Sequence, residues 1–157
     1  MNAGQAAASV VVLLVALTAV GVPSSSGASK SQIAIHEQGK DKRTASGAPL
    51  LGKFTIELAG APFGPKGTTR IFPSAGVTTY VSGQTRIGLA ATDALTSARG
   101  RIVLAITGTH IDVNGKLTPS GFFVGPSVEY GTWKIKTATG IYKEWRGGGI
   151  WASLEYG

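Results

Sequence analysis

The sequence predicts an all-β protein, an antiparallel β-barrel of about eight short strands preceded by an N-terminal signal-peptide helix. Three observations predict the barrel. Apolar and polar residues alternate in several short runs, glycine and proline separate these runs, and helical periodicity is poor after residue 29. The chain has 157 residues, with 23 glycines and no cysteine. Without disulfides, a sheet that closes on itself is favoured because closure removes exposed edge strands.

The N-terminal segment has the layout of a secretory signal peptide. Residues 1–29 carry no charged side chain, and the run 6–22 is almost wholly apolar. Ser26 and Ala28 supply the small residues of an A-x-A-like site, so we expect cleavage after Ala28 and a secreted protein. A helix over 6–22 should make few contacts with the barrel. The alternative is an uncleaved membrane anchor, although the run is at the short limit for spanning a bilayer.

The predicted division of the chain follows from this segment. Residues 1–28 are the signal peptide, 29–49 a polar flexible lead-in, and 50–157 the barrel domain. Within the lead-in, Ile33 and Ile35 are the only large apolar residues that precede residue 50, where the packed core is expected to begin. Every aromatic residue lies at or after Phe54.

The first strand expected in the barrel domain shows the clearest alternation. Phe54, Ile56 and Leu58 share one face of this strand, as period two requires of a half-buried antiparallel strand. Residues 92–99 fit either a short helix or a polar loop. The expected strands are 53–58, 68–72, 78–81, 85–91, 101–113, 122–124, 128–137 and 149–156.

Two turn regions have specific local predictions. Asn114-Gly115 lies between two strand-like runs and predicts a type I′ hairpin, which needs positive φ at both central residues. The segment 138–149 predicts a single helical or 3₁₀ turn with Tyr142 and Trp145 on one side. Its glycines favour a close backbone reversal over a phosphate cradle, because no helix follows them.

One C-terminal stretch carries a family resemblance. It runs Gly131-Thr132-Trp133-Lys134-Ile135 and then from Ala138 to Gly149, with a glycine-rich turn at its end. This stretch resembles the end of the small secreted proteins of the allene oxide cyclase-like and dirigent-like barrel group. Ala138 replaces the first glycine of the group's turn, and Trp145 takes a position usually held by Leu or Ala. Upstream, 52–56 and 100–104 resemble the opening and middle strands of the group. The resemblance implies a barrel. It implies no particular activity, because the group includes cyclases and non-catalytic stereochemical guides, and no catalytic pattern matches here.

Candidate catalytic residues are few. Only His36 and His110 are histidines, and period two places His110 and Asp112 on the inward face of the strand 101–113, near one mouth of the barrel. A His/Asp pair on one face suits acid–base work, although a polar rim is the plainer interpretation. Tyr130 is a third residue to test because it lies on a strand near a Gly/Pro turn. No metal site is predicted, since three or four convergent ligands are lacking.

Charge and composition leave three function hypotheses. The net charge is +7, but the basic residues are dispersed, so we expect no nucleic acid partner; an anionic glycan or lipid surface fits better. The leading hypothesis is a non-catalytic binder of a small hydrophobic ligand. The alternatives are an allene oxide cyclase-like isomerase with an apolar barrel pocket, and a cationic extracellular surface-interaction protein. No cofactor is expected, and the oligomeric state stays open.

Overall fold

The structure of the protein is a computed structural model that describes residues 10–15, 19–24, 27–40, 50–74, 78–81, 84–112 and 127–155. It is all-β and antiparallel, as predicted. The elements are β1 (Val10–Val15), β2 (Ala19–Ser24), β3 (Gly27–Lys40), β4 (Leu50–Leu58), β5 (Ala61–Pro62), β6 (Gly67–Ser74), β7 (Thr78–Val81), β8 (Gln84–Ser97), β9 (Gly100–Asp112), β10 (Ser127–Ala138), the 3₁₀ helix η1 (Gly140–Tyr142) and β11 (Gly148–Glu155).

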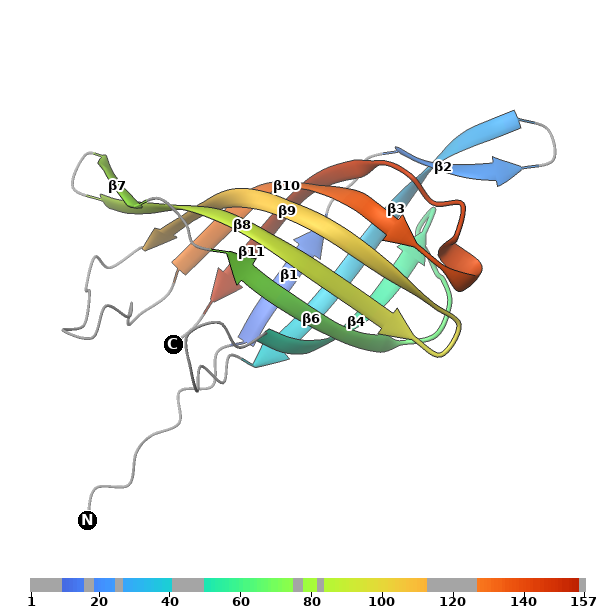
Figure 1. Ribbon diagram of the computed structural model, residues 1–157, viewed down its shortest axis with the longest axis horizontal. Helices are drawn as coiled ribbons and strands as arrows, with labels where there is room; N and C mark the ends of the chain where they lie inside the picture. Colours follow the sequence, from blue (N-terminus) through green and yellow to red (C-terminus); the bar gives the residue numbers. More distant parts are fainter. Residues whose placement is uncertain are drawn as a thin grey trace, which may run out of the picture.

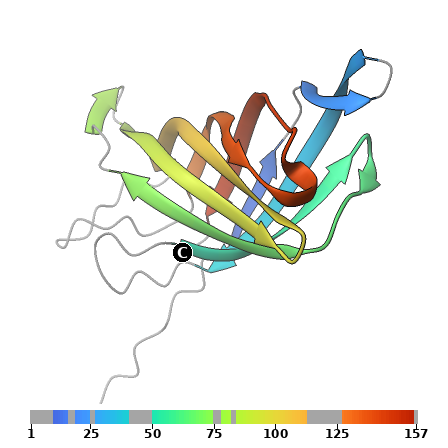
Figure 2. The same ribbon diagram turned by 45° about the vertical axis from the view of Figure 1, so that its right-hand side comes forward.

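Eight of the described strands pair into a ring. The ladder runs β3–β1–β11–β10–β9–β8–β6–β4, and β4 pairs again with β3, so the sheet closes. Figures 1 and 2 show these strands tilted around a common interior, with η1 at one end. The remaining strands are appendages: β2 pairs with β3, β5 with β4, and β7 with β8. Closure leaves no edge within the ring, which is how a barrel avoids exposed strand edges.

The alternation read from the sequence is observed in β4. Phe54 and Ile56 are buried, whereas Lys53 and Thr55 are exposed. The neighbouring strand β8 is longer than expected. It continues through 92–97, where a short helix or a polar loop was predicted, and Leu95 and Asp93 are fully buried on it. Pairing with both β6 and β9 holds this stretch extended.

The structure also corrects the prediction that residues 29–49 are a polar lead-in outside the barrel. Residues 27–40 form β3, a strand of the barrel that pairs with β1 on one side and β4 on the other. Ile33 and Ile35 belong to the buried core of the barrel. The boundary predicted at residue 50 is therefore wrong, because these two isoleucines are the start of a period-two strand.

In place of the helix expected over 6–22, the structure has strands wherever it describes this segment. The backbone of β1 pairs with β11 and with β3, and β2 forms a hairpin with β3 that extends beyond the barrel (Figure 1). We expected this segment to make few contacts with the barrel. That expectation is wrong for Val10–Val15, whose backbone pairs with two strands of the barrel. No helix among the described residues has the length and apolarity to cross a membrane.

The 3₁₀ turn predicted near Tyr142 is confirmed and closes one end of the core. Tyr142 and Trp145 are buried, with ring centroids 5.1 Å apart and an edge-on geometry. Phe63 packs 5.3 Å from the Trp145 ring. Gly140 is required at the start of this turn, because its φ is +62° and a Cβ there would lie 2.0 Å from the Arg99 carbonyl oxygen.

The rest of the buried core consists of side chains that point inward from the ring, and Phe63 and several partly buried residues pack against it. Two of its tryptophans link neighbouring strands, because Trp133 on β10 donates a hydrogen bond to the Ile150 carbonyl oxygen on β11 and Trp151 on β11 donates one to the Thr107 carbonyl oxygen on β9. The buried core residues are Ile33, Ile35, Phe54, Ile56, Leu95, Ile102, Leu104, Ile106, Trp133, Ile135, Tyr142, Trp145 and Trp151.

Candidate functional site

A row of polar residues crosses the inner face of the barrel away from the aromatic end. Strand register aligns His110 on β9 with Glu129 on β10, and Glu129 with Ser153 on β11. Directly paired residues of antiparallel strands share a face of the sheet. His110 and Ser153 are buried, so this face is the interior. We call His110, Glu129, Ser153 and Glu37 the polar row.

The polar row continues across β1 to β3. Ser153 pairs with Leu13 on β1, and Leu13 pairs with Glu37 on β3. Glu37 is only 4% exposed. The row therefore follows one register line across β9, β10, β11 and β3, with β1 between the last two.

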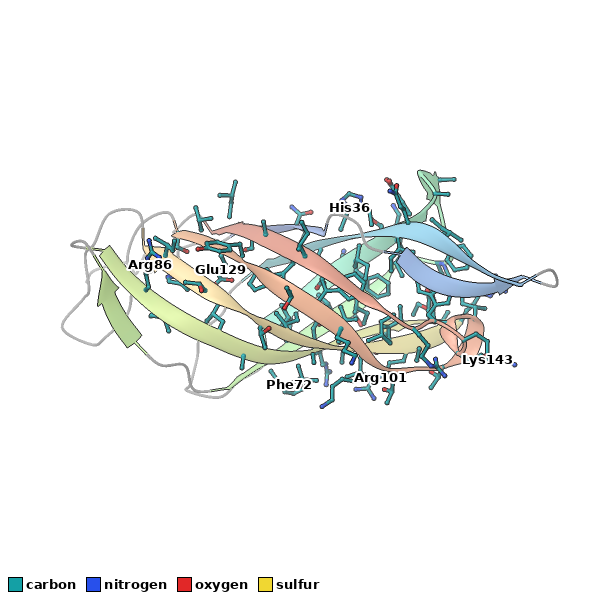
Figure 3. All side chains as sticks on the ribbon, turned by 90° about the horizontal axis from the view of Figure 1, so that it is seen from above. His36, Phe72, Arg86, Arg101, Glu129 and Lys143 are labelled. Carbon is teal, nitrogen blue, oxygen red and sulfur yellow. The ribbon has the colours of Figure 1, made fainter. Side chains whose placement is uncertain are left out.

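Within the polar row, the side chains of His110 and Glu129 are in direct contact. The Nδ1 atom of His110 lies 2.8 Å from Oε1 of Glu129, and both side chains are largely buried. Figure 3 shows Glu129 toward the end of the barrel that lies opposite Lys143, the residue that follows η1. A carboxylate on one ring nitrogen orients the imidazole and fixes which nitrogen carries a proton.

Glu37 and Asp93 form a second buried acidic group. Asp93 is completely buried on β8 and accepts a hydrogen bond from the hydroxyl of Thr69 on β6. The carboxyl group of Glu37 is buried beside that of Asp93 and forms hydrogen bonds with Asp93 and with the Thr69 hydroxyl. The hydroxyl of Ser153 is buried and has no hydrogen-bond partner among the described residues.

Burial changes the acidity of both carboxyls. Burial, and after it the negative charge of Asp93, raises the pKa of Glu37 well above its ordinary value. Burial also raises the pKa of Asp93, although hydrogen bonds to its carboxylate, including the one from Thr69, oppose the change. Two close carboxyls in a dry interior do not both ionise readily. The pair therefore retains a proton at pH values where exposed carboxyls have lost theirs.

A glycine keeps the space beside this pair free of side chains. Gly52 on β4 pairs with Gly39 on β3 and with Thr69 on β6. A Cβ at Gly52 would lie 2.8 Å from Cγ2 of Thr69 and 2.8 Å from the Gln38 carbonyl oxygen. The absence of a side chain at this inward position lets β3, β4 and β6 approach closely next to the acidic pair.

Two of the three residues proposed for testing, His110 and Tyr130, lie on opposite faces of the sheet. His110 points inward as predicted and is buried. Tyr130 is 44% exposed and lies on the outer face of β10, so it does not face His110. The backbone of Asp112 pairs with Ser127, but the Asp112 side chain is outside the described residues. The Asn114-Gly115 hairpin and the strand predicted at 122–124 also lie outside them.

The sequence interpretation missed Glu37 and Asp93. A signal for Glu37 was present, since it continues the alternation of Ile33 and Ile35 by one more step of two. Asp93 likewise stands two residues before Leu95. Polar residues at inward positions break the apolar pattern, so alternation alone ends the strand too early. Among the residues that the structure describes, no group of three or more His, Asp or Glu side chains converges to hold a metal ion.

Comparisons with protein-family models, with curated proteins and with solved structures find no match for this chain. The resemblance to the allene oxide cyclase-like and dirigent-like barrels therefore stays a prediction. What the site can do rests on the geometry of its own residues.

Proposed function

We propose that the barrel binds one small, neutral, mainly apolar molecule in its interior. The observation that supports this proposal is the pair Glu37 and Asp93, which is buried inside a barrel whose core is otherwise mainly apolar. An apolar lining favours a hydrophobic molecule, and a few convergent polar groups fix its orientation. A neutral ligand with a hydrogen-bonding group matches this site because the acidic pair holds a proton that it can donate and carboxyl oxygens that can accept.

A fluorescent probe of this chemistry tests the proposal. N-phenyl-1-naphthylamine is apolar and neutral and carries one N–H donor, whereas 1-phenylnaphthalene lacks the donor. We expect saturable binding of the first compound at one site per chain. Glu37→Gln should weaken that binding about tenfold, which corresponds to one charge-assisted hydrogen bond.

The matched control is Glu57→Gln, because the Glu57 side chain is 44% exposed, outside the interior. Its affinity for the probe should equal that of the unaltered protein. The proposal fails if the probe does not bind, or if the Glu37 and Glu57 variants bind it equally well.

The acidic pair also favours a second candidate function, proton transfer to a bound molecule. A carboxyl that keeps its proton at pH values where exposed carboxyls have lost theirs, next to one that accepts a proton, is the arrangement of a general acid and base in isomerisation. Glu37 would donate a proton to one atom while Asp93 removes a proton from another. Deuterium exchange into 2-tetralone, an apolar enolisable ketone, measures this activity. Exchange at the background rate, or exchange that survives Glu37→Gln, would exclude it.

For localisation, we propose export with cleavage after Ala28. The uncharged apolar run and the small residues Ser26 and Ala28 support this proposal. Cleavage there would remove β1 and β2 from the chain and leave β3 beginning at Ser29. The N-terminal mass of protein recovered from its own host decides between cleavage and retention.

A further inference from the structure

Exposed basic side chains gather at the end of the barrel that η1 closes. Three connections meet at this end, between β4 and β6, between β8 and β9, and between β10 and β11. Four basic residues lie in these connections and a fifth lies at the start of β9, and all five are exposed. They are dispersed in the sequence, so the fold and not a basic motif brings them to one end. We call this group the basic cap, and its members are Lys66, Arg99, Arg101, Lys143 and Arg146.

Backbone hydrogen bonds hold part of the basic cap against η1. The Arg99 carbonyl oxygen accepts a hydrogen bond from the Ile141 amide at 3.0 Å. The Arg101 carbonyl oxygen accepts one from the Thr139 amide at 2.8 Å. These bonds fix the turn between β8 and β9 beside the turn that carries Lys143. A fixed backbone lowers the entropy that is lost when such side chains bind a ligand together.

The positive charge of the basic cap is not neutralised by the part of the protein that the structure describes. None of the five side chains forms an ion pair with a described acidic residue. Glu144 is the one acidic residue in the three connections. Nη1 of Arg146 donates to the carbonyl oxygens of Lys143 and Trp145, at 2.8 and 2.7 Å, and these neutral acceptors leave its charge in place. The cap therefore presents concentrated positive charge to solvent, which attracts anions.

We propose that the basic cap binds an acidic polysaccharide, a hydrated chain that carries carboxylate or sulfate groups. Lysine pairs with such anions as a point charge, and the guanidinium fork of arginine contacts two of their oxygens at once. Single-stranded nucleic acid fits the cap less well, because its bases need exposed aromatic rings on which to stack. The rings at this end pack against one another, and those of Tyr142 and Trp145 are buried.

The positions of the exposed apolar side chains favour a hydrated chain over a lipid bilayer. The large apolar residues that the structure shows as exposed stand on β4, β6, β10 and β11, and none of them lies in the three connections at the cap. Proteins that lie in a membrane interface bury apolar side chains at the headgroup boundary. The cap offers charge without such a group. This proposal does not rest on the small-ligand function.

The test compares two double variants that remove the same charges from different places. Arg99→Gln with Lys143→Gln removes one arginine and one lysine from the cap. Arg70→Gln with Lys53→Gln removes one of each from β6 and β4, where both side chains are exposed outside the cap. Dextran sulfate and polygalacturonate are the acidic chains, and uncharged dextran is the control ligand. Titration calorimetry on the full chain, at roughly 20 mM and 150 mM salt, measures the affinities.

We expect the unaltered protein to bind at least one acidic chain and not dextran. At the lower salt concentration the cap variant should bind about tenfold more weakly, whereas the β4–β6 variant should lose less than about twofold. The two variants should melt at the same temperature as the unaltered protein, which shows that both are folded. Binding of dextran sulfate alone would assign sulfate as the recognised group, and binding of polygalacturonate alone would assign carboxylate.

Four results would overturn the proposal. The protein binds neither acidic chain, it binds dextran equally well, or the two double variants lose the same affinity, which would make net charge the cause. The fourth concerns the partner. Phosphatidylserine vesicles and single-stranded DNA are titrated with the same variants, and a larger loss for either of them than for the polysaccharides would assign the cap to that partner instead.

Discussion

Two neighbouring carboxyl groups in a buried interior are unfavourable when both are ionised, and Glu37 and Asp93 form such a pair. The interior makes the proton of Glu37 hard to remove, because burial and the charge of Asp93 both disfavour a second negative charge. This penalty reduces the stability of the fold at pH values above the ordinary pKa of a carboxyl. Carboxyls perturbed in this way are candidates for a functional site.

This penalty predicts a specific dependence of stability on pH. Because the pKa of Glu37 is raised in the folded protein, the unfolded chain loses its proton first, near the ordinary value of 4.5, and stability falls as the pH rises above that value. Below it, both states are protonated and the effect is absent. Glu37→Gln removes this titration. The variant should therefore be more stable than the unaltered protein at pH 7, by an amount that shrinks toward pH 4.

Urea denaturation at several pH values measures this difference directly. Glu57→Gln, on a side chain 44% exposed, provides the reference for a carboxyl outside the core. Parallel stability curves for the unaltered protein and the Glu37 variant would show that Glu37 titrates as an exposed carboxyl does.

The second prediction at this scale concerns Gly52. Gly52→Ala adds a Cβ 2.8 Å from both Thr69 Cγ2 and the Gln38 carbonyl oxygen, so a strand must shift. We expect a loss of about 1–3 kcal/mol of unfolding free energy, the usual effect of overpacking. Lys53→Ala, exposed at the next position, should change stability by less than about 0.5 kcal/mol. A Gly52 variant as stable as the Lys53 variant would contradict the close packing beside Asp93.

Among the elements, η1 and the turn that follows it close one end of the barrel. Phe63, Tyr142 and Trp145 pack against one another there, and the Tyr142 hydroxyl lies 3.4 Å from Oγ of Ser97 in the β8–β9 turn. This contact joins two connections that are 45 residues apart in the sequence. The aromatic group thus holds the hairpin and the end of β10 together.

Truncation of one ring tests this role. Trp145→Ala removes a side chain that is 2% exposed and should reduce the free energy of unfolding by about 3–5 kcal/mol. Lys143→Ala, exposed in the same turn, is the control and should have little effect. Equilibrium unfolding in urea gives both values. The near-ultraviolet circular dichroism of the packed rings should weaken in the first variant only.

The elements differ in how far the sequence predicts them. Strands whose inward residues are all apolar were found with ends correct to a few residues, as Phe54 and Ile56 illustrate, because alternation is a local property. Two strands with a buried acidic residue were mispredicted, because Glu37 and Asp93 resemble solvent-facing positions: β3 was assigned to the lead-in and β8 was ended early. By contrast, β9 and β10 were predicted to within a few residues, although His110 and Glu129 point inward near their ends. The polar row itself was beyond prediction from one sequence. It depends on the register between β9, β10, β11 and β3, which is set by long-range pairing.

At the scale of the whole molecule, the chain carries a net charge of +7. Exposed cations stand on four strands, at Lys53 on β4, Arg70 on β6, Arg101 on β9, and Lys134 and Lys136 on β10. We therefore expect attachment to anionic phosphatidylserine vesicles that is driven by charge. Such attachment should weaken about tenfold or more between roughly 20 mM and 150 mM salt, as screening shortens the range of the interaction.

Co-sedimentation with vesicles at increasing salt measures this attachment, with uncharged phosphatidylcholine vesicles as the control. Binding to both kinds of vesicle that is independent of salt would indicate an apolar contact instead.

The pairing of β1 with β11 also has a consequence for the order of events during synthesis. The first strand of the barrel to leave the ribosome is held between β3 and the last strand to be made. The ring cannot close until Ala152 to Leu154 have been translated, however early the other strands pair. Contacts between such distant parts of a chain form slowly. The nascent chain therefore stays open along this seam until β11 has emerged.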